Sequence, residues 1–143
     1  MDAILVAGER VWLLDSVTEG GPEQSGAVVV TASHGGVSAA RYAAAYRPRL
    51  VVFNDAGIGK EEAGVAGLAI LEHLGVAALA VAAKSARIGD AADTWESGVI
   101  SRINAPAREM GFAVGERLRE MVERYLARCA ASPRCSRSPD ATS

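Results

Sequence analysis

The sequence is short of several residue types, and each shortage excludes a class of protein. Its 143 residues include two cysteines and only 5% aromatic residues. Cys129 and Cys135 lie close to the C-terminus, and no further ligands follow them at the spacing of a zinc site. We therefore expect incidental thiols and no metal site. Half of the residues are hydrophobic, mainly Ala, Val and Leu, so small aliphatic side chains must build the core.

Long apolar runs and clusters of positive charge are also missing. The longest apolar run, 76–83, is much shorter than the ~20 residues that a membrane span requires. The 15 basic and 17 acidic residues are interspersed and give a formal net charge of −2, whereas nucleic-acid binding needs clustered Lys and Arg. The first residues also lack the positively charged start of a signal peptide. We expect a cytoplasmic protein that binds neither membranes nor nucleic acids.

The glycine motifs of nucleotide-binding proteins are absent as well. The stretch 57–60 (Gly-Ile-Gly-Lys) resembles the end of a Walker loop, but Glu61 follows it and Asn54 stands where that motif needs its first glycine. A Rossmann dinucleotide motif would need a glycine at the position of Glu62. The sequence therefore supports neither ATP nor NAD, and we expect no cofactor; a single metal ion bound by His34 and Asp55 is the alternative.

Short apolar runs alternate with helical patterns along the chain. They predict a β-hairpin at 3–14 with a tight turn at Ala7–Glu9, buried strands at 27–32, 49–54 and 76–83, and helices at 36–46 and 61–75. Continuous apolar runs are typical of parallel strands that are covered by helices on both faces. We therefore predict a small, largely parallel sheet, a hairpin followed by β-α-β-α-β, in a Rossmann-like layered α/β sandwich.

The C-terminal third is less regular. Residues 84–103 read as a loop with a possible short strand at 99–103. A long last helix should begin with Asn104 as its N-cap, because Pro106 suits a first turn. One face of that helix is apolar at helical spacing, with Val114, Leu118, Met121, Val122 and Tyr125. We expect one α/β domain over 1–129 and a disordered tail over 130–143, which is rich in Ser, Pro and Arg.

Three polar segments follow the three predicted parallel strands: 33–36 (Ser-His-Gly-Gly), 54–60 and 84–90. Parallel strands end at one edge of their sheet, where open α/β sheets bind ligands. These segments hold both lysines of the chain, one of its two histidines and five of its glycines. Hydrophobic burial does not require such residues at these places, so we expect a shared small-molecule site.

The first segment has the clearest chemistry. Gly35 and Gly36 at a helix start can present N–H groups to an anion. His34 is a candidate for proton transfer near neutral pH, and Ser33 is a candidate nucleophile or substrate-positioning group. The two side chains should point to opposite faces, so a nucleophilic Ser33 would need its base from another segment. A plain strand-to-helix turn with a serine cap is the alternative.

The other two segments supply further candidates. Asn54 and Asp55 bind substrate or hold their own loop, with Asp55 also a candidate base. Gly57, Gly59 and Lys60 are expected to bind substrate as well. In the third segment Lys84 is a catalytic candidate, and Ser85, Arg87 and Asp90 are binding candidates. Arg87 suits a carboxylate or phosphate, and an Arg87–Asp90 pair on a charged surface turn is the alternative.

Three functions remain open from the sequence. The first is a cofactor-independent enzyme acting on a small anionic metabolite at the carboxyl edge, with hydrolase-type chemistry slightly favoured over lyase or isomerase chemistry. The second is a non-catalytic ligand-binding or regulatory subunit that uses the same pocket. The third is a structural subunit of a larger assembly. In each case the small, alanine-rich chain is expected to form a homo-oligomer.

Overall fold

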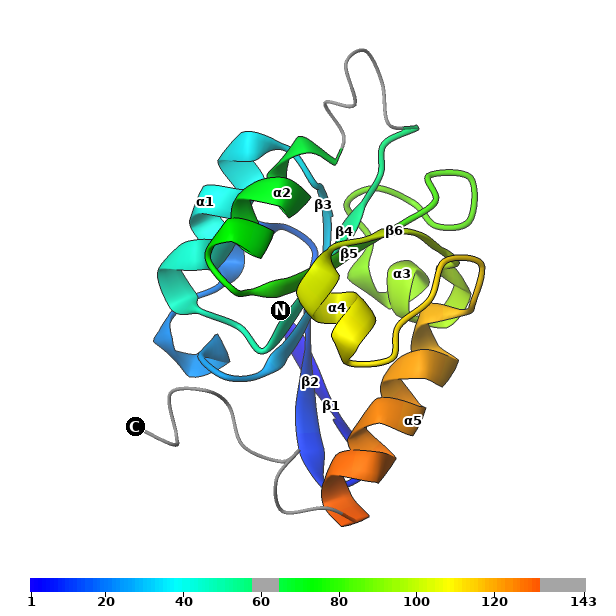
Figure 1. The fold of residues 1–143 in the computed structure, drawn as a ribbon. Helices are drawn as coiled ribbons and strands as arrows, with labels where there is room; N and C mark the ends of the chain where they lie inside the picture. Colours follow the sequence, from blue (N-terminus) through cyan, green and yellow to red (C-terminus); the bar gives the residue numbers. More distant parts are fainter. Residues whose placement is uncertain (58–64, 132–143) are drawn as a thin grey trace.

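The computed structural model describes residues 1–57 and 65–131, which form one six-stranded sheet with its strands in chain order (Figure 1). The strands are β1 (Asp2–Val6), β2 (Glu9–Leu14), β3 (Val28–His34), β4 (Leu50–Asn54), β5 (Ala77–Val81) and β6 (Ile100–Ile103). β2, β3, β4 and β5 are parallel, whereas β1 and β6 run antiparallel at the two edges. The predicted largely parallel sheet is therefore confirmed.

The N-terminal hairpin turns at Ala7 and Gly8, within the predicted turn at Ala7–Glu9, whereas Glu9 is already the first residue of β2. Ala7 and Gly8 both have positive φ angles, 51° and 82°. This backbone geometry matches the twist of the flanking strands, and it sets Val6 opposite Glu9. The register then continues to Asp2 opposite Leu13.

Helices cover both faces of the sheet, so the layered α/β sandwich is also confirmed. α1 (Val37–Tyr46) and α2 (Ala66–His73) pack on one face, because right-handed crossovers between strands in chain order return along the same side. α3 (Ala91–Ser97), α4 (Ala105–Glu109) and α5 (Leu118–Ala131) pack on the other face (Figure 1). Every residue of β4 and β5 is buried, in agreement with their continuous apolar sequences.

A short helix occupies part of the stretch that the sequence suggests is a loop. The Asp90 side chain begins α3 by accepting a hydrogen bond from the Asp93 amide at 3.0 Å. Trp95 on this helix is only 4% exposed and belongs to the core. β6 follows at 100–103, within the short strand that the sequence suggests.

The predicted last helix begins at its predicted cap and is then interrupted. The Asn104 side chain accepts from the Ala107 amide at 3.2 Å and begins α4. Gly111 and Gly115 then take φ angles of 100° and 93°, which end one helix before the next begins. Val114 lies in this break and is 57% exposed, so its assignment to the apolar helix face is wrong. Leu118, Met121, Val122 and Tyr125 are buried, as predicted.

The end of the described chain differs from the expected loose tail. α5 continues to Ala131, and Cys129 is 1% exposed within the core. Cys129 is therefore a packed helix residue, because it falls on the buried face of α5. Residues 132–143, which include Cys135 and most of the predicted tail, lie outside the described residues. Within 1–57 and 65–131, no helix has the length and apolar character to cross a membrane.

Gly67 fixes the distance between α2 and the start of α1. Its amide donates to the Gly35 carbonyl at 2.8 Å. A Cβ atom on Gly67 would lie 2.7 Å from the Ala40 Cβ and 2.9 Å from the Gly35 carbonyl oxygen. The helix therefore approaches the backbone that follows β3 too closely for any side chain.

We predict that Gly67→Ala lowers the free energy of unfolding by about 1–2 kcal/mol, because the clash outweighs the helix propensity gained from alanine. Gly21→Ala is the matched control, since a Cβ there meets nothing within 4 Å. Urea unfolding of both variants measures the difference. Equal midpoints for Gly67→Ala and the unmodified chain would contradict the close packing.

Candidate functional site

The three polar segments come together at the carboxyl edge of the parallel strands. The Gly35 amide donates to the Asn54 carbonyl at 3.1 Å, which joins the first segment to the second. The Asn54 side-chain amide donates to the Ala86 carbonyl at 3.0 Å, which joins the second to the third. The Gly89 amide donates to the Ala32 carbonyl at 2.9 Å and joins the third segment to β3 directly before the first segment. The edge is therefore one connected structure.

Ser33 and His34 are the last residues of β3 and not part of a loop. The Ser33 hydroxyl oxygen accepts a hydrogen bond at 2.9 Å from the amide of Val17, the first residue of a short 3₁₀ turn (Val17–Glu19). This contact holds the turn against β3. The serine therefore has a structural partner on the chain that precedes it.

His34 is exposed, and its ring nitrogens have different roles. Nδ1 accepts a hydrogen bond from the Gly36 amide at 3.2 Å. Because a backbone N–H can only donate, Nδ1 carries no proton in this contact, and the neutral ring has its proton on Nε2. His34 therefore presents a proton donor to solvent. A role as base at Nε2 would require the other tautomer and the loss of the Gly36 bond.

The amides of Gly35 and Gly36 are both engaged inside the protein. Gly35 donates to Asn54, as described above, and Gly36 donates to His34. The two amides proposed as anion donors therefore hold the strand ends together. The next amides along the chain belong to the first turn of α1, which an α-helix leaves without intrahelical partners.

Asn54 and Asp55 are buried, with exposed fractions of 0% and 5%. One Asp55 oxygen accepts from the amides of Gly57 and Ala83 at 2.8 and 2.9 Å, and the other accepts from the Ser101 hydroxyl at 2.7 Å. The Asn54 side-chain oxygen accepts from the Ala56 amide at 2.8 Å.

These bonds hold Ala56 and Gly57 at φ angles of 53° and 73°, in the left-handed region. Of the two sequence interpretations of Asn54 and Asp55, the observed contacts favour the loop-holding one.

The segment after β5 contains both anchored and exposed side chains. The Ser85 hydroxyl donates to the Ala82 carbonyl at 2.7 Å and accepts from the Val99 amide at 3.0 Å. Asp90 caps α3. Lys84 and Arg87 are exposed, and neither side chain has a partner among the described residues. No ion pair joins Arg87 to Asp90 in this part of the chain; the Arg87 amide instead donates to the Asp93 carboxylate at 2.8 Å.

The remaining second-segment candidates are only partly visible. Gly57 lies in the left-handed turn, whereas Gly59 and Lys60, with the predicted helix start at 61, lie outside the described residues. The described candidates therefore divide into two sets.

The first set holds the backbone of the edge and consists of Ser33, Gly35, Gly36, Asn54, Asp55, Gly57, Ser85 and Asp90. His34, Lys84 and Arg87 are exposed, and all three present hydrogen-bond donors.

Sequence reasoning missed two residues of this edge. Asp15 follows β2 and accepts from the Ala91 amide at 2.9 Å, which ties the first parallel strand to the start of α3. Ser101 on β6 binds Asp55. Asp15 carries a usable signal, because a polar residue directly follows an apolar run there, just as Asn54 does. Ser101 has no such signal in the sequence, since its contact with Asp55 depends on the pairing of β6 with β5.

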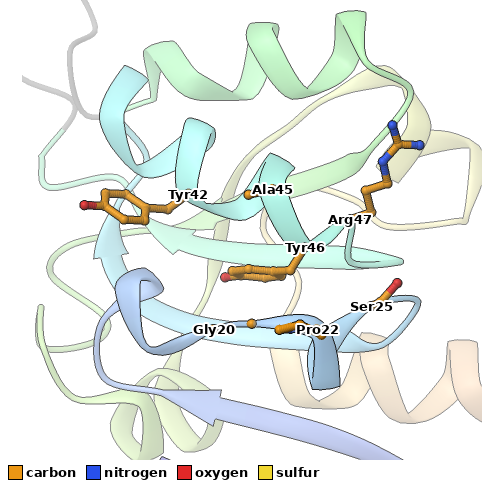
Figure 2. Close-up of a pocket in the computed structure, with 8 residues that line it drawn as sticks. Gly20, Pro22, Ser25, Tyr42, Ala45, Tyr46 and Arg47 are labelled. Carbon is orange, nitrogen blue, oxygen red and sulfur yellow. The ribbon is translucent and has the colours of Figure 1, made fainter.

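A separate cavity of about 400 Å³ lies beside α1 (Figure 2). Its lining includes Gly20, Pro22, Tyr42, Tyr46 and Arg47 and none of the predicted site residues. The Tyr46 hydroxyl donates to the Val17 carbonyl at 3.3 Å, and burial raises the pKa of this phenol, which therefore remains neutral. Figure 2 shows the Arg47 guanidinium directed away from the Tyr46 ring. The walls are mostly apolar and offer no nucleophile–base pair.

Metal binding finds no support in the described part of the chain. Among residues 1–57 and 65–131, no group of three or more His, Cys, Asp or Glu side chains is placed to hold a metal ion. Comparison of the chain with protein-family models, with curated proteins and with solved structures finds no match. The functional argument therefore depends on the geometry of this chain.

We predict that Asp55→Ala lowers the free energy of unfolding by about 2–4 kcal/mol, because it leaves buried donors without an acceptor. Asp55→Asn is the matched control. Its oxygen can still accept from the Gly57 and Ala83 amides, and its NH₂ group can donate to Ser101, so the expected loss is below about 1.5 kcal/mol. Urea unfolding followed by circular dichroism measures both. Equal stability of the two variants would contradict a structural carboxylate.

Proposed function

We propose that the protein binds a small anionic metabolite at the carboxyl edge of its sheet and acts on it as a cofactor-independent enzyme. The observation that supports this is the division of polar groups at the edge. The carboxylates of the edge are occupied: Asp55 is buried with three donors, and Asp15, Asp90 and Asp93 each accept from a backbone amide. The exposed side chains, His34, Lys84 and Arg87, are donors without a side-chain partner in the described ranges. An anion complements such an edge better than a cation does.

Each exposed residue then has a distinct role in the proposal. Arg87 binds a carboxylate or phosphate through two parallel hydrogen bonds, because its guanidinium is planar. Lys84, three residues earlier on the same loop, adds a mobile positive charge. The Nε2–H group of the neutral His34 ring donates a hydrogen bond to the negative charge that develops on the substrate, which is the role that the tautomer favours. Hydrolase-type chemistry uses such a donor, and so do lyases and isomerases.

A non-catalytic ligand-binding subunit is the second candidate. One observation favours it: the hydroxyl of Ser33 and the carboxylate of Asp55 are both taken up by hydrogen bonds within the protein. Ser33 is therefore less suited to act as a nucleophile, and Asp55 is less suited to act as a base. In this case the same three donors hold the ligand and no bond is broken.

Anion binding is tested by titrating inorganic phosphate into the full chain and following the backbone amide resonances. We expect the largest shifts at residues 34–38 and 84–90. Arg87→Gln should weaken binding roughly tenfold or more, since a charge-assisted hydrogen bond contributes about 1.5–3 kcal/mol. Arg124→Gln, which changes an exposed arginine on α5, is the control and should bind as the unmodified chain does. Uniformly small shifts, or equal losses in both variants, would argue against the site.

Catalysis is tested with a panel of carboxylic and phosphoric esters. His34→Ala should lower kcat by roughly 100-fold or more if the Nε2–H group of His34 stabilises the developing charge, while phosphate affinity stays within a few-fold. Because His34 is exposed, the variant should fold normally, which thermal unfolding verifies. Phosphate binding with no turnover of any ester would favour the ligand-binding subunit.

A further inference from the structure

The two edges of the sheet differ in how their free backbone groups are covered. At the β6 edge, the Ile100 amide donates to the Glu116 carbonyl at 2.9 Å, and the Gly115 amide donates to the Ile100 carbonyl at 2.8 Å. The segment before α5 thus pairs with the outer side of β6. β1 is the other edge strand, and among residues 1–57 and 65–131 β2 is its only neighbour in the sheet.

β1 also lacks the usual protection of an edge strand. Its residues from Ala3 to Val6 are Ala, Ile, Leu and Val, without charge or proline. Proteins commonly guard open edges with lysine, proline or bulges, because an apolar edge pairs with another strand. β6 has Arg102 near its centre, whereas β1 exposes Leu5 to 75%.

The hairpin register shows which backbone groups of β1 are open. In a two-residue hairpin, the residues that flank the turn exchange both hydrogen bonds, so Val6 points its N–H and C=O toward Glu9. Hydrogen-bonded pairs alternate along the strand, and Ile4 therefore also points toward β2. Ala3 and Leu5 point their N–H and C=O groups away from the sheet.

We propose that β1 pairs antiparallel with β1 of a second copy of this chain, about a two-fold axis that passes between the two Ile4 residues. Ala3 then lies opposite the partner subunit's Leu5, and Leu5 lies opposite the partner subunit's Ala3. Each of these pairs exchanges both hydrogen bonds, because Ala3 and Leu5 both point their N–H and C=O groups outward, and the two-fold axis makes the two pairs equivalent. The two sheets become one continuous sheet.

The side chains suit this arrangement. A small residue faces a large one on one side of the sheet, where Ala3 opposes Leu5. On the other side the two Ile4 residues meet, next to a cavity of about 310 Å³. This cavity is lined by Ile4, Leu5, Val6, Leu13 and Trp95 and by the charged cluster of Glu96, Arg119 and Glu123. The partner's Ile4 adds apolar surface at the open side of that cavity.

The charges at the strand ends are compatible with the pairing. Asp2 lies opposite the uncharged Val6 of the partner subunit. The next carboxylate across the sheet is Glu9, which forms an ion pair with Arg49 at 2.7 Å. Arg49 therefore offsets the repulsion between Glu9 and the incoming Asp2. No pair of like charges stands directly opposite in this register, so a second copy fits the edge better than a highly charged partner strand does.

Analytical ultracentrifugation of the full chain tests the proposal. We expect a concentration-dependent dimer, and Leu5→Lys should raise its dissociation constant roughly tenfold or more by placing a charge at the interface. Leu74→Lys is the matched control, because Leu74 is 59% exposed at the end of α2, outside this edge. A monomer at all concentrations would overturn the proposal. So would a dimer that Leu5→Lys leaves intact or that Leu74→Lys dissociates.

A disulfide tests the register independently, in a Cys135→Ser background. Ile4→Cys should form an intermolecular disulfide under mild oxidation, because residues opposite each other in a non-hydrogen-bonded pair have Cα atoms about 4.5 Å apart, within the range of a disulfide. Ala3→Cys should not, since the two Ala3 residues are offset along the strands beyond the roughly 7 Å limit. Equal cross-linking of both variants, or of neither, would overturn the two-fold axis at Ile4.

Discussion

Three separate segments donate hydrogen bonds to the carboxylate of Asp55, and the carboxyl edge depends on these bonds. They come from the turn after β4, the turn after β5 and the middle of β6. Because the Asp55 carboxylate is buried, its removal would leave each of these donors without a hydrogen-bond partner from either protein or water. Asn54 extends the same principle to the loop after β5 through the Ala86 carbonyl. Two adjacent buried side chains thereby determine where the exposed donors of the edge can stand.

Most of the fold could be predicted from the sequence, because local residue patterns mark most of its helices and strands. Continuous apolar runs marked the buried strands, and Asn104 with Pro106 marked the start of α4. α3 was missed because seven residues with several small or polar side chains carry no helical period; its stability comes from the Asp90 cap and the buried Trp95. The break between α4 and α5 was missed because Gly111 and Gly115 act through backbone angles that the apolar pattern does not record.

The candidate site could be predicted only in part. The meeting of the three segments follows from parallel strands, and Ala32, Asn54 and Ala86 indeed link them. The separation of anchoring from exposed residues does not follow from residue type. Ser33 and Ser85 read as functional hydroxyls in the sequence, yet their partners, Val17 and Val99, lie 16 and 14 residues away. Such contacts depend on tertiary structure, which local patterns do not describe.

The order of the strands in the sheet is the same as their order along the chain, and therefore the order of their synthesis. Each new strand therefore finds its neighbour already present, and the loops that must close are short, which favours rapid folding. α5 is the exception, since this last described helix packs against β1, the first strand. The apolar face that α5 covers stays open until residues 118–131 have been synthesised. Nascent chains are thus most prone to associate through the hairpin before α5 is in place.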